Sequence, residues 1–234
     1  MLEGRELSKS FGRTRALRGA DVRVADGEIL AVMGPSGSGK STLLHCLGGV
    51  LRPDAGEVRF GEVRPGAGEA SVGEVRLDRL SDRELSRLRR GTFGFVFQFG
   101  QLVPELPLIE NIALPLLLAG RSRRPALAEA ADWVARLGLD GLWDRLPGEL
   151  SGGQAQLAAV ARALIAAPRV VFADEPAGSL DSVAADEVME LLVDTVRAQG
   201  ACMVLVTHEP RVAAFADRTV TVRDGRVVQP VGAR

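Results

Sequence analysis

The fold is decided by the stretch Gly34-Pro35-Ser36-Gly37-Ser38-Gly39-Lys40-Ser41-Thr42. It satisfies the pattern G-x-x-x-x-G-K-[ST] and lies between an apolar run at 28–33, which predicts a strand, and a run at 42–50, which predicts a buried helix. That order of strand, glycine loop and helix is the context that a phosphate-binding loop requires. The glycines let backbone N–H groups converge on a polyphosphate at the N-terminal end of the helix. We expect Lys40 to reach the β- and γ-phosphates and the Ser41 hydroxyl to bind Mg²⁺.

Two adjacent carboxylates follow a second apolar run. Residues 170–173 predict a buried strand, and Asp174 and Glu175 come directly after it. In enzymes with a phosphate loop the first such carboxylate positions Mg²⁺. The second is then placed to polarise an attacking water. Taken alone, the pair would read equally well as a solvated strand end, but its position after a phosphate loop favours the catalytic interpretation.

The composition is that of a globular protein without a nucleic-acid-binding surface. The chain has 234 residues, 46% of them hydrophobic and 25% charged, and its net charge is −1. This length suits one sizeable α/β domain or a core with a sub-domain. A charge so close to zero gives no basic surface for nucleic acid.

Neither the cysteines nor the apolar runs indicate a secreted or membrane-spanning chain. Cys46 and Cys202 lie in apolar segments, which favours small buried side chains over a disulfide or a zinc site. The chain start lacks a signal-peptide pattern. The most apolar run, at 112–120, contains Pro115 and is far shorter than the ~18 residues of a spanning helix. We therefore expect a soluble, cytoplasmic protein without direct membrane insertion.

The remaining elements alternate between strand and helix, apart from one helical block. Strands are predicted at 2–11, 16–24, 92–98, 169–173 and 201–206, with a closing hairpin at 220–228. Helices are predicted at 81–90, 104–118, 125–137, 152–167 and 182–198. In the first of these helices, Ser81 and Glu84 have the spacing of a capping box.

The tetrapeptide Gly-Glu-Val-Arg occurs three times between Gly56 and Arg76. Its irregular, short spacing does not fit a solenoid. We interpret it as strand and turn material, with a glycine-rich insertion at 64–72. A functional repeat is the alternative interpretation.

The stretch Glu149-Leu150-Ser151-Gly152-Gly153-Gln154 narrows the class of nucleotide-binding protein. It resembles the signature sequence of ATP-binding-cassette ATPases, and with the two motifs above the resemblance covers nearly the whole chain. The resemblance implies a RecA-like P-loop core with an antiparallel β sub-domain (1–98 and 168–234) and a helical sub-domain (99–167). It also implies a head-to-tail dimer, most simply a homodimer, that encloses two ATP molecules with Mg²⁺.

The resemblance assigns roles to further residues. Gln98 matches the Q-loop glutamine, which contacts Mg²⁺ or the lytic water, and His208 matches the switch histidine at the γ-phosphate. The residues that match the signature, which acts on the nucleotide of the opposite subunit, are Ser151, Gly152, Gly153 and Gln154. Asp181 ends the segment 178–181, which matches the D-loop at the subunit interface. Phe11 is in the place of the aromatic residue that stacks on adenine.

Three positions depart from the family's common pattern. Leu157 replaces an arginine that often follows the signature, and Ala177 and Ser179 replace the threonine and asparagine that are frequent after the paired carboxylates. None of the three is expected to contact phosphate or metal, so the departures are compatible with ATP hydrolysis.

The segments 80–85 and 94–120 are similar to the branch of the family that serves lipoprotein release, macrolide export and antimicrobial-peptide export. This similarity implies a separate integral-membrane permease and a position on the inner face of the cell membrane. Residues 98–110 would form the groove for the permease. The apolar residues Leu106, Leu108, Ile109 and Ile112 fit either that groove or plain core.

Two other functions compete with a transporter subunit. One is a soluble regulatory cassette, although this chain has one cassette, no heptad repeat and no basic face. The other is a degenerate nucleotide-binding partner in a heterodimer, which the intact Lys40, Glu175 and His208 argue against.

Overall fold

The computed structural model describes residues 1–61, 74–98 and 100–228. The insertion predicted at 64–72 lies outside the described residues. The chain divides into two compact units, one formed by Met1–Ser86 with Cys202–Arg234 and the other by Arg87–Ala201. Each unit is described by itself.

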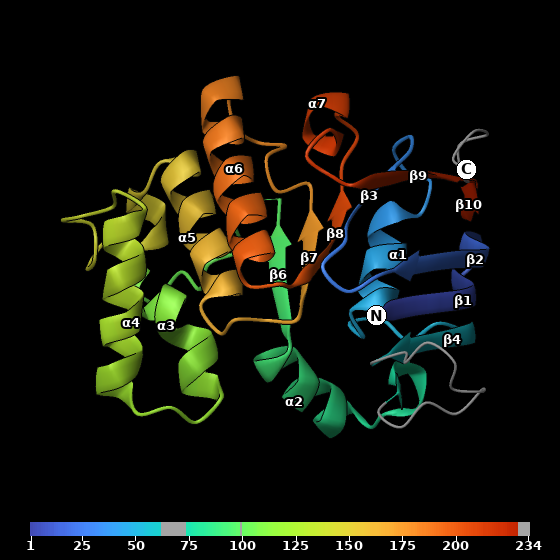
Figure 1. Ribbon diagram of the computed structural model, residues 1–234, viewed down its shortest axis with the longest axis horizontal. Helices are drawn as coiled ribbons and strands as arrows, with labels where there is room; N and C mark the ends of the chain where they lie inside the picture. The colour runs from blue at the N-terminus through green and yellow to red at the C-terminus, as the bar shows by residue number, and fades with distance from the viewer. Residues whose placement is uncertain (62–73, 99, 229–234) are drawn as a thin grey trace. The chain divides into compact units, whose positions relative to one another are not determined.

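The first unit contains an antiparallel sheet with the strand order β2-β1-β4-β5. Its strands are β1 (Leu2–Phe11), β2 (Thr14–Val24), β4 (Ala55–Phe60) and β5 (Val75–Arg76). β1 and β2 form a long hairpin, which is visible beside β4 in Figure 1. Leucine and valine side chains on one face of the hairpin are buried, as the strand alternation predicts.

The same unit contains a set of strands in which β3 is central and parallel to both neighbours. β3 (Ile29–Met33) pairs with β8 (Cys202–Val206) on one side and β9 (Arg218–Arg223) on the other. β10 (Arg226–Val228) closes the hairpin with β9, as the sequence predicts. The helices are α1 (Lys40–Leu47), which packs against β1 and β2, and α7 (Pro210–Ala213).

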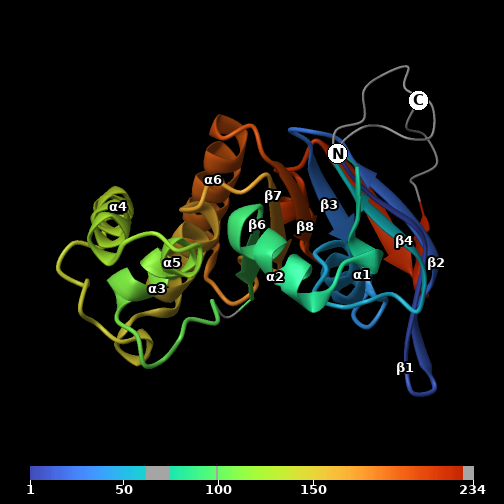
Figure 2. The same cartoon turned by 90° about the horizontal axis from the view of Figure 1, so that it is seen from below.

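In its described residues, the second unit contains two parallel strands and four α-helices that lie entirely within it. β6 (Phe93–Phe97) and β7 (Val170–Asp174) pair in parallel, and the rings of Phe93 and Phe95 pack on Phe172. The helices are α3 (Leu108–Leu118), α4 (Arg123–Arg136), α5 (Gly152–Leu164) and α6 (Ser182–Ala198). α5 contacts α3, α6 and β6, and Figure 2 shows it between α6 and α3. The strand–helix alternation confirms the predicted α/β class.

Among the described residues, two short 3₁₀ helices and α2 complete the elements. The 3₁₀ helices are Leu77–Arg79 and Pro147–Glu149, and α2 spans Asp82–Gly91. The predicted capping box is confirmed: the Ser81 N–H donates to Glu84 at 2.8 Å and the Glu84 N–H donates to Ser81 Oγ at 3.4 Å.

The helix predicted at 104–118 begins only at Leu108. Proline disfavours helical backbone in the residue before it, and both Pro104 and Pro107 lie in the first turn of the predicted helix. The buried side chain of Asn111 holds the non-helical segment, because its Oδ1 accepts from the Val103 N–H at 2.7 Å and its Nδ2 donates to the Leu106 carbonyl at 2.7 Å.

Within α3, Leu108 and Ile112 are fully buried. Of the four apolar residues that fit either the permease groove or plain core, these two therefore belong to the core. Leu106 and Ile109 are half-buried. Within the described part of the chain, no helix has both the length and the apolar character needed to cross a membrane.

Both cysteines are buried thiols outside any disulfide, as the sequence predicts. Burial raises the pKa of the Cys46 thiol to about 11, so the reactive thiolate is scarce at neutral pH. We expect that an aromatic disulfide reagent at pH 8 labels neither cysteine in the folded protein and labels both in guanidinium chloride. Rapid labelling of the native protein, followed by absorbance, would contradict the burial of these residues.

Candidate nucleotide-binding site

The phosphate loop is a tight backbone turn between β3 and α1, and two of its positions can hold only glycine. Gly34 and Gly39 have φ values of 143° and 107°. A Cβ atom at Gly34 would lie 2.2 Å from the Val222 carbonyl oxygen, and one at Gly39 would lie 2.3 Å from the Ala16 carbonyl oxygen. Both the conformation and the close backbone approach therefore require glycine.

The side chains of Lys40 and Ser38 lie at this loop, and each can form a further hydrogen bond. Lys40 is 8% exposed, and its ammonium donates to the carbonyls of Gly34 and Pro35 at 2.9 and 3.0 Å. An ammonium group has three N–H donors. Ser38 Oγ is buried and has no hydrogen-bond partner among the described residues. A loop that keeps a buried cation and an unsatisfied hydroxyl fits an anionic ligand, because orphaned buried polar groups are rare.

His208 leaves the strand next to the phosphate loop. Val206 at the end of β8 lies opposite Val32 of β3 in a parallel register, so the segments after both strands emerge at the same edge. Thr207 stays in the pairing because its N–H donates to the Val32 carbonyl at 3.2 Å. The next residue, His208, is exposed. The structure thus brings the predicted histidine and the loop to one edge of the first unit.

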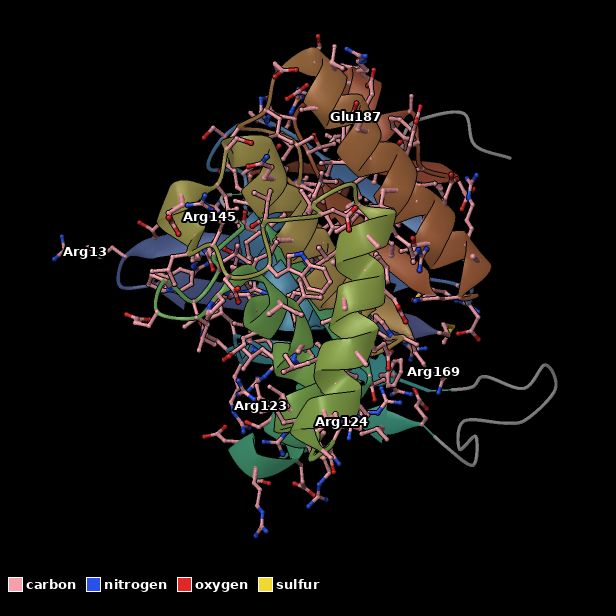
Figure 3. The ribbon with its side chains drawn as sticks, turned by 90° about the vertical axis from the view of Figure 1, so that its left-hand side faces the viewer. Arg13, Arg123, Arg124, Arg145, Arg169 and Glu187 are labelled. Carbon is pink, nitrogen blue, oxygen red and sulfur yellow. The ribbon has the colours of Figure 1, made fainter. Side chains whose placement is uncertain are left out.

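Phe11 lies at the tip of the β1–β2 hairpin, where it pairs with Thr14. It is 50% exposed, which leaves a ring face available. The Lys9 ammonium lies 5.9 Å from the ring centroid and pairs with Asp54 at 2.8 Å. Arg13, in the turn, projects away from the ribbon in Figure 3.

The second unit holds Gln98, Asp174 and Glu175 together. Phe97 lies opposite Asp174 in the parallel pair, so Gln98 and Glu175 are the first residues beyond two adjacent strand ends. Glu175 has φ +49°, a left-handed conformation that costs a residue with a Cβ about 1 kcal/mol. Strain of this kind at a carboxylate next to a strand end is typical of functional sites.

The signature segment is the N-terminus of α5. Ser151 caps the helix: its Oγ accepts from the Gln154 N–H at 3.3 Å, and the Ser151 N–H donates to Gln154 Oε1 at 2.9 Å. This reciprocal pair is a capping box. Gly152 is exposed and Gly153 is partly exposed. Small residues in the first turn leave helical N–H groups accessible to an anion.

Asp181 caps α6. Its Oδ1 accepts from the N–H groups of Val183 and Ala184 at 3.0 and 3.1 Å. Aspartate is among the preferred capping residues, so this carboxylate has a structural role within its own chain.

The sequence analysis missed two polar side chains of α5. Gln156 is 1% exposed and donates to the carbonyls of Phe97 and Pro176. Arg162 donates to the carbonyls of Gly100 and Gln101 at 2.7 and 2.9 Å, and burial lowers the pKa of its guanidinium. The available signal was that Gln156 and Arg162 lie beyond the signature in a helix otherwise rich in alanine and leucine.

The fold and the loop define a protein that binds and hydrolyses a nucleoside triphosphate. The sequence profile of the ABC transporter family matches residues 17–178, and the chain belongs to that family. It is therefore an ABC ATPase, the nucleotide-binding component of a transporter, as the sequence predicts.

Two relatives match this chain over 97% or more of its length. The lipoprotein-releasing system ATP-binding protein LolD of Geobacter metallireducens is 44% identical over 97% of this chain and 98% of its own length. The macrolide export ATP-binding/permease protein MacB of Marinobacter nauticus is 41% identical over 100% of this chain, which spans 35% of that protein.

Solved structures of the ATP-binding cassette MJ0796 have the same fold. One is a dimer in a post-hydrolysis state bound to ADP and Pi; it has a TM-score of 0.86 and 34% identity, and the match covers 98% of this chain and 97% of that one. A second dimeric structure of MJ0796 gives a TM-score of 0.87. The RecA-like P-loop fold and ATP binding are thereby confirmed for this chain.

Proposed function

We propose that this chain is the ATP-hydrolysing subunit of a lipoprotein-releasing transporter. The observation that carries the proposal is the likeness to LolD along 98% of that protein's length. MacB is named as ATP-binding protein and permease in one chain, of which this chain spans 35%. We also propose that an integral-membrane permease partners this chain at the inner face of the cell membrane.

In this proposal the phosphate loop holds ATP with Mg²⁺. The Lys40 ammonium is positioned by two loop carbonyls and keeps one N–H for the β- and γ-phosphates. The N–H groups of the loop and the unsatisfied Ser38 hydroxyl line the same turn. Ser41 and Asp174 are the Mg²⁺ ligands, and Phe11 offers its exposed ring to adenine. Bound Mg-ATP supplies the phosphoryl group that water attacks.

Three residues act on the attacking water and the γ-phosphate. Glu175 accepts the proton of the water, since it is a carboxylate held just beyond the strand end. Gln98, from the neighbouring strand, orients the water and completes the metal contacts. His208 donates to the γ-phosphate from the edge shared with the phosphate loop.

A second copy of the chain completes each site. The capping box of Ser151 and Gln154 orders the first turn of α5 so that the N–H groups of Gly152 and Gly153 face the partner's γ-phosphate. The segment that ends at Asp181 lies at the same interface. The dimeric structures of MJ0796 support this arrangement.

We further propose that residues 99–167 form a helical sub-domain, with 1–98 and 168–234 forming the core and the β sub-domain. The segment 98–110 at its edge receives the permease. Its backbone is held by Arg162 and Asn111, so force on it would reach α5 and the signature.

The proposal is tested by capturing the partner. Tagged Glu175→Gln protein, incubated with ATP and mildly solubilised membranes of its host, is expected to retain a permease with a large external domain, identified by mass spectrometry. Glu187→Gln protein, which loses the same charge on the exposed face of α6, is the control for trapping. Recovery of soluble partners alone, such as ribosomal or repair proteins, would replace the transporter with the regulatory cassette.

A further inference from the structure

We propose that Gln156 and Ser179 are positioning residues for hydrolysis, because they tie the backbone of Gln98 to the turn that carries Glu175. The inference rests on the proposed roles of Gln98 and Glu175. It assigns a role to a helix residue that lies two positions after the signature and to one of the positions where this chain departs from its family's pattern. All four residues belong to the second unit.

The ladder between β6 and β7 stops where the two functional residues begin. Phe97 and Asp174 form the last register pair, and the chain beyond each of them turns into a loop. Hydrolysis nevertheless requires the Gln98 amide and the Glu175 carboxylate to face the same water. Positional errors of about 1 Å cost on the order of 100-fold in rate, so some further connection between the two loops is needed.

Gln156 of α5 supplies the first connection between the two loops. Its side chain is 1% exposed, and Nε2 donates to the Phe97 carbonyl at 3.1 Å and to the Pro176 carbonyl at 2.7 Å. These carbonyls belong to the residue just before Gln98 and the residue just after Glu175. One buried amide group thereby uses both of its N–H donors to fix the spacing of the two loops.

Ser179, which follows the turn from Glu175 to Gly178, supplies the second connection. Its Oγ donates to the carbonyl of Gln98 at 3.1 Å. The turn itself is closed by the Gly178 N–H, which donates to the Glu175 carbonyl at 3.1 Å. A Cβ atom at Gly178 would lie 3.4 Å from Gln98 Nε2, so the glutamine side chain lies directly against this turn.

The two connections also account for the backbone of Glu175. A residue with a Cβ stays at φ +49° only where its surroundings hold it there. Gln156 fixes the carbonyl of Pro176, and the Ser179 turn fixes the carbonyl of Glu175. Losing the Gln156 bond to Pro176, or the Ser179 bond that holds this turn against Gln98, would free Glu175 to relax toward ordinary backbone and turn its carboxylate away from the water.

The test separates positioning from stability and from nucleotide binding. Gln156→Met keeps the length of the side chain and removes both donors; Ser179→Ala removes the hydroxyl, and Ser179→Thr keeps it. We expect Gln156→Met to lower kcat for ATP about tenfold or more with KM within about twofold of wild type. Ser179→Ala should lower kcat several-fold, and Ser179→Thr should restore it.

The double variant Gln156→Met/Ser179→Ala should lose less activity than the product of the two single effects, since both act on the same pair of residues. Unchanged kcat in Gln156→Met and Ser179→Ala, or equal losses in Ser179→Ala and Ser179→Thr, would overturn the inference. If Gln156→Met does not fold, the inference is tested by Ser179→Ala and Ser179→Thr alone, because Ser179 is exposed and its substitution should not prevent folding.

Glu175→Gln measured beside these variants keeps the two proposals apart. If Glu175→Gln hydrolyses ATP at the wild-type rate, the proposed catalytic site is wrong. If it is inactive while the positioning variants match wild type, only the inference fails.

Discussion

Lys40→Ala is expected to abolish ATP turnover and to weaken ATP binding by roughly 10- to 100-fold. The ammonium is the buried cation of the phosphate loop, held by the carbonyls of Gly34 and Pro35. A hydrogen bond to a charged group is worth roughly 1.5–3 kcal/mol, and each 1.4 kcal/mol is about tenfold in affinity. Titration calorimetry with ATP and Mg²⁺ and a phosphate-release assay measure the two losses separately.

The matched control removes a positive charge where no phosphate is expected. Arg124 is exposed in the first turn of α4, in the second unit (Figure 3). Arg124→Ala should bind ATP as the wild type does. If Lys40→Ala retained wild-type affinity with an unchanged circular dichroism spectrum, the loop would not be the nucleotide site.

Local sequence predicted the parts of the site that depend on local backbone. A glycine loop between a strand and a helix needs only its own residues, and the spacing of Ser81 and Glu84 is enough for a capping box. The hairpin at the end of the described chain follows from Asp224-Gly225, both at positive φ. These features were expected within a few residues of where the structure has them.

The sequence could not predict features that depend on contacts between distant segments. The partners of Gln156 are 59 and 20 residues away along the chain. The strain at Glu175 is a further case, since nothing in Asp-Glu-Pro requires positive φ. The motifs predict the candidate site residues, whereas the residues that hold their backbone are recognised only in the folded structure.

The second large effect is expected for Glu175→Gln, which should hydrolyse ATP at least 100-fold more slowly while still binding it. General-base catalysis contributes typically 10²–10⁴-fold, and glutamine has the size of glutamate without a basic oxygen. Since the ATP-bound state would persist, a dimer should accumulate with ATP and Mg²⁺ and be absent with ADP. Size-exclusion chromatography with light scattering gives the mass of each species.

Glu187→Gln, an exposed α6 variant with the same change of charge (Figure 3), should hydrolyse ATP at the wild-type rate and form no persistent dimer. Because both variants lose one negative charge, a difference between them in hydrolysis or dimer formation cannot result from the change in net charge. A Glu175→Gln protein that stays monomeric with ATP would rule out the enclosed-nucleotide dimer. In that case the exposed N-terminus of α5 at Ser151 would have no partner nucleotide to contact, and the signature would keep only its capping role. A persistent dimer would instead place the helix end and the strained carboxylate at one shared site, where ATP binding closes the two subunits and hydrolysis reopens them.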